Sequence, residues 1–231
     1  QEAFMEAFHV IATHPQILAG TGDCNSQYDV FGNFSRAITP NGTPSPHLQW
    51  DPTEQEIFDA ITDKRLDEDS MAMIPEGMTA RAFAAHVARE RLRSAVPDVD
   101  TYCDAEINDS MYFTLFPNFH PWGAFNRINY RFRPVGTKVD ECIMECIYTE
   151  DFEGDERPAP AEYIELGIDQ EWTELIPVIG NLARVFHQDS FNLPKVQKGL
   201  ETFRADGLTL TKYQEVKIRH WHAMAERFIA N

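Results

Sequence analysis

The chain has 231 residues, of which 43% are hydrophobic and 25% are charged, so it is long enough to bury one substantial core. Its formal net charge of −17 repels nucleic-acid phosphates and no cluster of Lys and Arg compensates, which argues against a nucleic-acid-binding protein. No apolar run approaches the roughly 20 residues of a membrane span, so no membrane association is expected and the cytoplasm is the expected location. Four cysteines are too few for a disulfide scaffold at this length.

The first fifteen residues combine two histidines with acidic and apolar side chains. On a helix Glu2, Glu6 and His9 project from one side. Pro15 disfavours helical geometry at His14, so we expect a helix whose end curls to bring His14 towards the same point as His9. Two imidazoles need only one carboxylate to complete a facial triad for non-haem iron(II), although two histidines at this spacing are usually not ligands.

The rest of the chain predicts a single α+β domain over residues 1–231. Period-two alternation indicates strands over 27–38, 111–117, 124–134 and 141–149. Helical spacing indicates helices over 51–66, 79–96, 172–190 and 211–229. Asp51 is the expected N-cap of the first of these helices. The last helix is expected to place four side chains inward: Tyr213, Trp221, Met224 and Phe228. Short turns between the later strands predict an antiparallel meander.

One carboxylate is notable because it continues an apolar stripe on a predicted helix. The stripe consists of Ile179, Leu182, Val185 and Phe186. Asp189 follows on the same face, where a carboxylate is costly to bury unless a cation meets it. Asp189 could pair with an arginine, cap the segment that Pro194 should make irregular, or bind a metal. With His9 and His14 it would complete a facial triad.

The remaining histidines and two of the cysteines are interpreted as bystanders. His187 lies off the apolar stripe of its helix, and His220 and His222 lie on a charged helix near the C-terminus. Cys142 and Cys146 fall in a strand-like run without a second pair, so we expect buried thiols rather than a zinc knuckle.

Three separated motifs resemble the catalytic domain of the alpha subunit of Rieske-type aromatic-ring-hydroxylating oxygenases. E-x3-E-x2-H-x4-H, from Glu2 to His14, resembles the iron motif of that family. FPNFHPWG at 116–123, and VFHQDSFN at 185–192 followed by QKGL, resemble later parts of the same domain, as does the tail YQEVKIRHWHAMAERFI. The resemblance covers essentially the whole chain, and the motifs occur in the right order.

This resemblance implies a helix-grip fold, in which a curved antiparallel sheet packs on a long C-terminal helix. His9, His14 and Asp189 would hold mononuclear Fe(II), which would use dioxygen to hydroxylate an aromatic ring in the catabolism of aromatic hydrocarbons. Insertion of both oxygen atoms as a cis-diol is the favoured outcome, and a monooxygenase or demethylase variant would insert one. The rivals are a helix-grip module that binds an apolar ligand without redox chemistry and, more weakly, a hydrolytic metal site.

The resemblance also implies an electron donor outside this chain. Electrons derived from NAD(P)H would pass through a Rieske [2Fe–2S] cluster, whose C-x-H and C-x2-H pairs this sequence lacks. The chain starts without Met inside an expected helix, so we expect a fragment whose N-terminal Rieske domain is missing. Delivery would occur between neighbouring subunits of a homotrimer, served by a ferredoxin or reductase and possibly joined by a beta subunit. Glu6, where Asp is usual, would link the two metal centres.

Residues that contact the substrate are expected beside the iron. Three small or apolar residues lie next to the histidine face of the first helix: Ala3, Ala7 and Val10. The two alanines would leave room for a flat ring, although alanines often serve only close packing. Val185 lies one turn before the expected carboxylate ligand. His120, in the NFHPWG turn, could contact substrate or bond the backbone.

Overall fold

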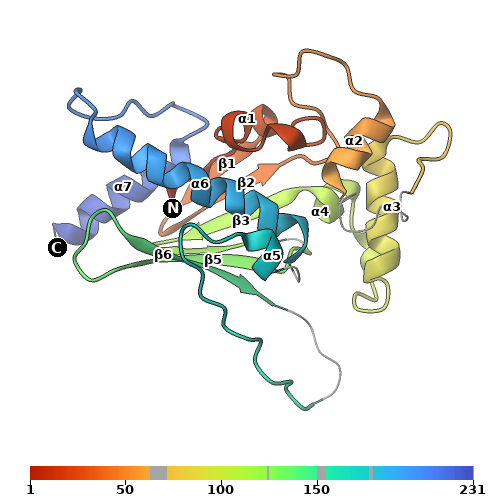
Figure 1. Ribbon diagram of the computed structural model, residues 1–231. Coiled ribbons are helices and arrows are strands. Elements are labelled where there is room, and N and C mark those ends of the chain that lie inside the picture. Colours follow the sequence, from red (N-terminus) through yellow and green to blue (C-terminus); the bar gives the residue numbers. More distant parts are fainter. Residues whose placement is uncertain (63–71, 124, 150–154, 177–178, 231) are drawn as a thin grey trace.

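The computed structural model describes residues 1–62, 72–123, 125–149, 155–176 and 179–230. Six antiparallel strands form one sheet in the order β1-β2-β3-β4-β5-β6, which confirms the α+β class and the meander (Figure 1). The strands are β1 (Gln27–Phe31), β2 (Phe34–Thr39), β3 (Ser110–Leu115), β4 (Phe119–Pro121), β5 (Ile128–Pro134) and β6 (Cys142–Tyr148).

A hairpin replaces the single strand predicted over 27–38. β1 and β2 pair antiparallel, with Phe31 opposite Phe34 across the two residues Gly32 and Asn33. Phe34 therefore lies on the opposite face of the sheet from Tyr28, whereas one continuous strand would have put both on the same face. Alternation of side chains cannot reveal a reversal of direction, but a two-residue Gly-Asn connection is a recognised hairpin signal.

The helices and 3-10 turns surround this sheet. The helices are α1 (Val10–Thr13), α2 (Glu54–Ile61), α3 (Ala80–Leu92), α4 (Asp104–Asn108), α5 (Trp172–Leu175), α6 (Asn181–Glu201) and α7 (Val216–Ile229). The 3-10 turns are η1 (Glu2–Met5), η2 (Pro15–Ile17), η3 (Asp23–Asn25) and η5 (Val99–Thr101). In Figure 1, α6 crosses the sheet with α1 beside it, and α2 and α3 lie together beyond one end of the strands.

Two apolar clusters meet on the sheet face that α6 and α7 cover. Three β5 side chains, Ile128, Tyr130 and Phe132, pack with Phe186 of α6. Tyr28, Ala37 and Tyr112 lie side by side on β1, β2 and β3 and pack with Val216, the first residue of α7. Trp122 packs against both clusters, so both helices share one face of the sheet, as the helix-grip fold requires.

The beginning of α2 lies two residues beyond its predicted N-cap. Thr53, not Asp51, caps the helix: its Oγ1 accepts from the Glu56 backbone N–H at 3.3 Å, and Glu56 Oε2 accepts from the Thr53 N–H at 2.8 Å. This reciprocal capping box satisfies two otherwise unpaired donors, which a cap at Asp51 would not. The predicted end of this helix lies outside the described residues. α3 ends at Leu92, before the predicted boundary at 96.

The C-terminal third also departs from the predicted helix boundaries. α6 continues through Pro194 to Glu201, because a helix tolerates one missing N–H where packing holds the rest. α7 starts at Val216 rather than near 211. Among the four side chains predicted to point inward, Met224 is buried and Trp221 half-buried, whereas Tyr213 and Phe228 are exposed. No helix in the described part of the chain is both long and apolar enough to cross a membrane.

Two cysteines predicted to be buried lie on the last strand of the sheet. Cys146 is half-buried and Cys142 is exposed, so the prediction of a buried thiol at Cys142 is wrong. The physical reason is position: β6 pairs only with β5 among the described strands, and Cys142 is its first residue. Burial, together with the charge of Asp189, raises the pKa of Cys146 to about 12.

Candidate metal centre

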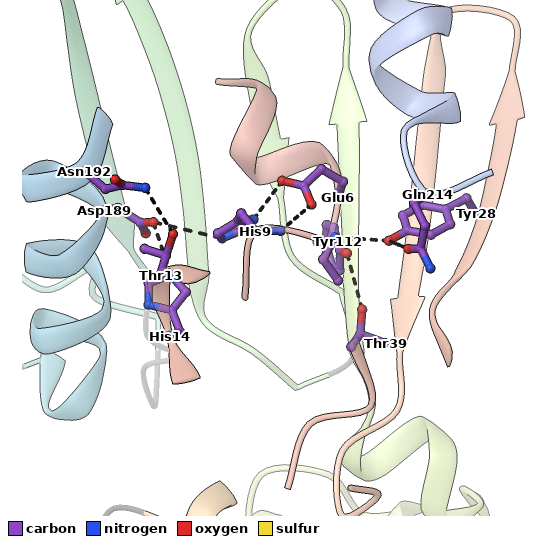
Figure 2. Close-up of polar contacts among 11 residues, drawn as sticks. Glu6, His9, Thr13, His14, Tyr28, Thr39, Tyr112, Asp189, Asn192 and Gln214 are labelled. Carbon is purple, nitrogen blue, oxygen red and sulfur yellow. Dashed lines mark hydrogen bonds and ion pairs between the residues drawn. The ribbon is translucent and has the colours of Figure 1, made fainter. Parts of the chain in front are cut away.

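Two histidines and one carboxylate from opposite ends of the chain converge on one point. The ligand atoms of His9, His14 and Asp189 all lie within 4.8 Å of one another. His14 Nε2 lies 3.1 Å and His9 Nε2 lies 4.0 Å from Asp189 Oδ1. Figure 2 shows Asp189 projecting from α6 towards the segment that carries both histidines. The three residues singled out in the sequence are thus brought together.

The segment that carries the histidines is not the single helix predicted. η1 ends at Met5, Glu6 is extended, and α1 begins at Val10. Glu6 Oε2 accepts the backbone N–H of His9 at 2.9 Å, replacing the backbone carbonyl that a continuous helix would offer. Glu2 consequently does not share a face with Glu6; it pairs instead with His222 of α7 at 2.7 Å.

Glu6 also orients the His9 ring. Its Oε1 lies 2.8 Å from His9 Nδ1, so Nδ1 donates the proton and Nε2 faces Asp189. Burial alone would lower the pKa of His9, but the hydrogen bond and charge of Glu6, together with the charge of Asp189, raise it. The His9 ring therefore lies between two carboxylates, as Figure 2 shows, in surroundings that favour a positive charge.

His14 is held by an amide instead of a carboxylate. Its Nδ1 lies 2.9 Å from Gln188 Oε1, which leaves Nε2 directed at Asp189. Gln188 is itself fixed by Gln16, which donates from Nε2 to Gln188 Oε1 at 2.7 Å and accepts from Gln188 Nε2 at 3.3 Å. Both histidines thus present the same ring nitrogen to the same carboxylate oxygen.

Asp189 is buried on the apolar face of α6, as the sequence predicted. It is 3% exposed, and within the described residues its carboxylate meets only the two imidazoles. Nearby, Asn192 Nδ2 donates to Thr13 Oγ1 at 3.2 Å and so ties α6 to α1. A buried carboxylate oxygen that two histidine Nε2 atoms face is a donor set suited to a cation, and it fits the two-histidine, one-carboxylate set of non-haem iron.

A second group of polar residues lies near Glu6, and no local pattern in the sequence indicates it. Tyr28 accepts the backbone N–H of Ala7 at 3.0 Å and donates to Gln214 Oε1 at 3.0 Å. Lys217 of α7 is 0% exposed, and its Nζ donates to the Tyr112 carbonyl at 3.2 Å. Burial lowers the pKa of Lys217 to about 7, although the charge of Glu6 opposes this shift.

The residues expected to contact substrate occupy different environments. Ala7 and Val10 are buried beside the histidines, and Ala3 and Val185 are half-buried. His120 is buried in β4, and its Nδ1 forms a hydrogen bond of 3.1 Å with the Thr114 hydroxyl rather than with a backbone group. Burial and the nearby charge of Lys217 lower the pKa of His120 to about 3. Its Nε2 has no hydrogen-bond partner among the described residues. Contact of these residues with a substrate stays a prediction.

The histidines expected to be bystanders lie outside this centre. His187 pairs with Glu171 at 3.1 Å, and His222 pairs with Glu2. His220 belongs to no group of potential metal ligands in the described part of the chain. These three histidines therefore offer no ligand to the centre formed with Asp189.

A family model described as "Ring hydroxylating alpha subunit (catalytic domain)" matches residues 1–231. No curated protein sequence and no solved structure matches the chain. The matched residues include both histidines of the centre, Asp189 and the whole sheet.

Proposed function

The chain belongs to the family of ring hydroxylating alpha subunit catalytic domains and is an aromatic ring-hydroxylating oxygenase; from this premise we propose that it uses one Fe(II) ion, held by His9, His14 and Asp189. The observation that carries the proposal is the convergence of two Nε2 atoms on one buried carboxylate oxygen, 3.1 and 4.0 Å away. A ligand set of this kind leaves coordination positions open on one side of the ion.

When bound, the iron would supply activation of dioxygen for insertion of both oxygen atoms into an aromatic ring as a cis-diol. The chain's own residues prepare the site for that ion. Glu6 and Gln188 hold the protons of His9 and His14 on Nδ1, so each Nε2 lone pair is free to bind. The apolar surroundings of Phe186 limit the access of water to Asp189 and strengthen its attraction for a cation.

We propose that electrons reach the iron through Glu6. The donor would be a Rieske [2Fe–2S] cluster on a neighbouring subunit of a homotrimer, reduced with NAD(P)H-derived electrons by a ferredoxin or reductase. Two observations support Glu6 as the link: it is hydrogen-bonded to a proposed ligand, and it lies on the opposite side of His9 from Asp189 (Figure 2). A beta subunit remains part of this proposal only through the family resemblance.

The substrate is proposed to be an aromatic small molecule next to the histidines. Ala7 and Val10 flank His9 in sequence and offer short side chains there, while Ala3 and Val185 would border the ring. His120, with Nε2 unpaired among the described residues and its pKa lowered by burial, would offer a neutral imidazole. Chemically, such a site suits a ring with few polar groups.

Iron binding tests this proposal most directly. Purified full-length protein is loaded anaerobically with Fe²⁺, total iron is measured by mass spectrometry, and the two irons of each Rieske cluster, counted from its visible absorbance, are subtracted. We expect about one mononuclear iron per chain, lost in His14→Ala and kept in His222→Ala and Cys142→Ala, which change residues outside the centre. Retention of the mononuclear iron in His14→Ala, or no uptake by the parent protein, overturns the proposal.

The monooxygenase or demethylase outcome is separated from the dioxygenase outcome by isotope labelling. Turnover under ¹⁸O₂ should place two labelled atoms in each product molecule if the reaction is a cis-dihydroxylation. One labelled atom per product would favour the variant that inserts a single oxygen. Activity without dioxygen or reductant would instead favour a hydrolytic metal site.

A further inference from the structure

A second cluster of potential metal ligands lies outside the centre described above. It consists of Asp23 and Cys24, in η3, and His47, in the loop that follows β2. Their ligand atoms all lie within 4.8 Å of one another. Cys24 Sγ is 3.1 Å and Asp23 Oδ2 is 3.7 Å from His47 Nδ1. No residue of this cluster takes part in the proposed oxygenase chemistry.

The Asp23 carboxylate is the observation that points to a ligand. Its side chain is 0% exposed, and neither carboxylate oxygen has a hydrogen-bond partner among the described residues. Burying an isolated carboxylate is unfavourable unless a cation compensates for its charge. His47 is the nearest possible cation, but 3.7 Å is too long for a hydrogen bond.

The distances in the cluster suit a tetrahedral ion. Zinc binds a thiolate at about 2.3 Å and imidazole or carboxylate at about 2.0–2.2 Å, so a tetrahedral site separates its ligand atoms by roughly 3.3–3.6 Å. The observed separations of 3.1 and 3.7 Å from His47 Nδ1 bracket that range. Cys24 Sγ also lies 3.7 Å from His47 Nε2, so the exposed His47 ring would have to turn for Nδ1 and Sγ to bind the same ion.

We propose that Asp23, Cys24 and His47 bind a zinc ion, with Nδ1 as the His47 donor and water as the fourth ligand. The His47 side chain is 44% exposed, which leaves that fourth position open to solvent. The thiolate distinguishes this site from the centre at Asp189, because sulfur favours zinc whereas two imidazoles and a carboxylate suit non-haem iron(II). The two sites should therefore load different metals in one chain.

The zinc would fasten two segments that border the oxygenase centre. Cys24 precedes β1, and its carbonyl accepts from Gln214 Nε2 at 3.2 Å. Gln214 in turn accepts from Tyr28, whose hydroxyl supports the Ala7 backbone next to Glu6. Closing the segment between Asp23 and His47 with a metal would constrain the unfolded chain and stabilise this corner of the fold.

The test uses full-length protein incubated with one equivalent of Zn²⁺ and then freed of excess metal. We expect about one zinc per chain, and the zinc X-ray absorption spectrum should show one sulfur neighbour at about 2.3 Å. Cys24→Ala should lose the sulfur neighbour and His47→Ala should weaken zinc binding at least tenfold. Cys103→Ala, which removes an exposed free thiol elsewhere, should change neither.

A sulfur neighbour distinguishes zinc bound by Asp23, Cys24 and His47 from zinc bound in the proposed iron centre. Zinc that had entered the His9, His14 and Asp189 centre would show only nitrogen and oxygen neighbours, and His14→Ala would remove it. Zinc with one sulfur neighbour in both the parent protein and His14→Ala supports the second site. A spectrum without sulfur in the parent protein, or sulfur retained in Cys24→Ala, overturns it, and the parent spectrum decides even if Cys24→Ala does not fold.

Discussion

Glu6 holds His9 through both oxygens of its carboxylate. Oε1 bonds the ring Nδ1 at 2.8 Å, and Oε2 accepts the backbone N–H at 2.9 Å. The same side chain therefore ends the regular turn at Met5 and selects the ring nitrogen that faces Asp189. Glu6 therefore accounts both for the break in the helix and for the orientation of the His9 imidazole.

Removing this carboxylate should weaken the metal centre. In Glu6→Ala, His9 loses the acceptor for its ring proton and for its backbone N–H, so the ring is free to rotate and to change tautomer. We expect the affinity for Fe²⁺ to fall about 10–100-fold, measured by anaerobic competition with a chromophoric chelator. An affinity within twofold of that of the parent protein would show that Glu6 does not orient His9.

Glu6→Gln separates orientation from electron delivery. The amide oxygen keeps one acceptor for His9, so iron should be retained, but the negative charge is lost. We expect slower turnover, with the loss appearing in single-turnover electron transfer from the reduced Rieske cluster rather than in iron content. An unchanged turnover rate in the full-length enzyme contradicts a role for Glu6 between the metal centres.

Gln188 orients the ring of His14 in the same way as Glu6 orients that of His9. Gln188→Leu removes the only described acceptor for the Nδ1 proton of His14, a ring that is 2% exposed. We expect a fall in Fe²⁺ affinity of about 10–100-fold. Gln188→Glu restores an acceptor and should recover most of the affinity. Arg184→Ala, an exposed change one turn earlier on α6, should leave the affinity unaltered.

Much of the centre could be predicted because its ligands are residue types that stand at recognisable positions in the sequence. Asp189 can be identified because a carboxylate continues an apolar stripe, whereas the spacing of His9 and His14 alone does not indicate ligands and gains its meaning from the family motif around it. The periodicity of apolar residues shows on which face of a helix or strand a side chain lies, provided that the segment is known to be a helix or a strand. It could not show that the Glu6 side chain would compete for the His9 backbone N–H and break the helix.

The supporting residues were beyond prediction for a different reason. Gln188 acts only because Gln16, from the other end of the chain, holds its amide. Lys217 lies among charged and aromatic residues of α7, and the sequence alone does not show which face of that helix is exposed. The burial of Lys217 depends on its packing against the Tyr112 ring. Contacts between residues so far apart depend on tertiary structure, which local patterns do not encode.

Tyr28 should contribute stability rather than metal affinity. Its hydroxyl accepts the backbone N–H of Ala7 and donates to Gln214, so Tyr28→Phe leaves a buried donor without a partner. We expect a loss of about 1–3 kcal/mol in the free energy of unfolding, measured by urea denaturation. Tyr213→Phe is the matched control, because that ring contacts Tyr28 edge-on but is 53% exposed, and should cost less than about 0.5 kcal/mol.

Lys217 should make stability depend on pH in the alkaline range. Burial lowers its pKa from 10.5 to about 7, with Glu6 as the facing negative charge and His120 nearby as a further titratable group. Between those values the unfolded chain binds more protons than the folded one, so the free energy of unfolding rises as the pH is raised from about 7 towards 10.5.

The variant Lys217→Met isolates this effect, because other titrating groups are common to both proteins. The rise in the free energy of unfolding between pH 7 and pH 10 should be larger in the parent protein than in Lys217→Met, by up to roughly 3.5 kcal/mol. Urea denaturation at several pH values measures the difference. Parallel pH profiles for the two proteins would mean that the lysine is equally protonated in the folded and unfolded chains, and that its ammonium group is stabilised in the core by Glu6 and the Tyr112 carbonyl.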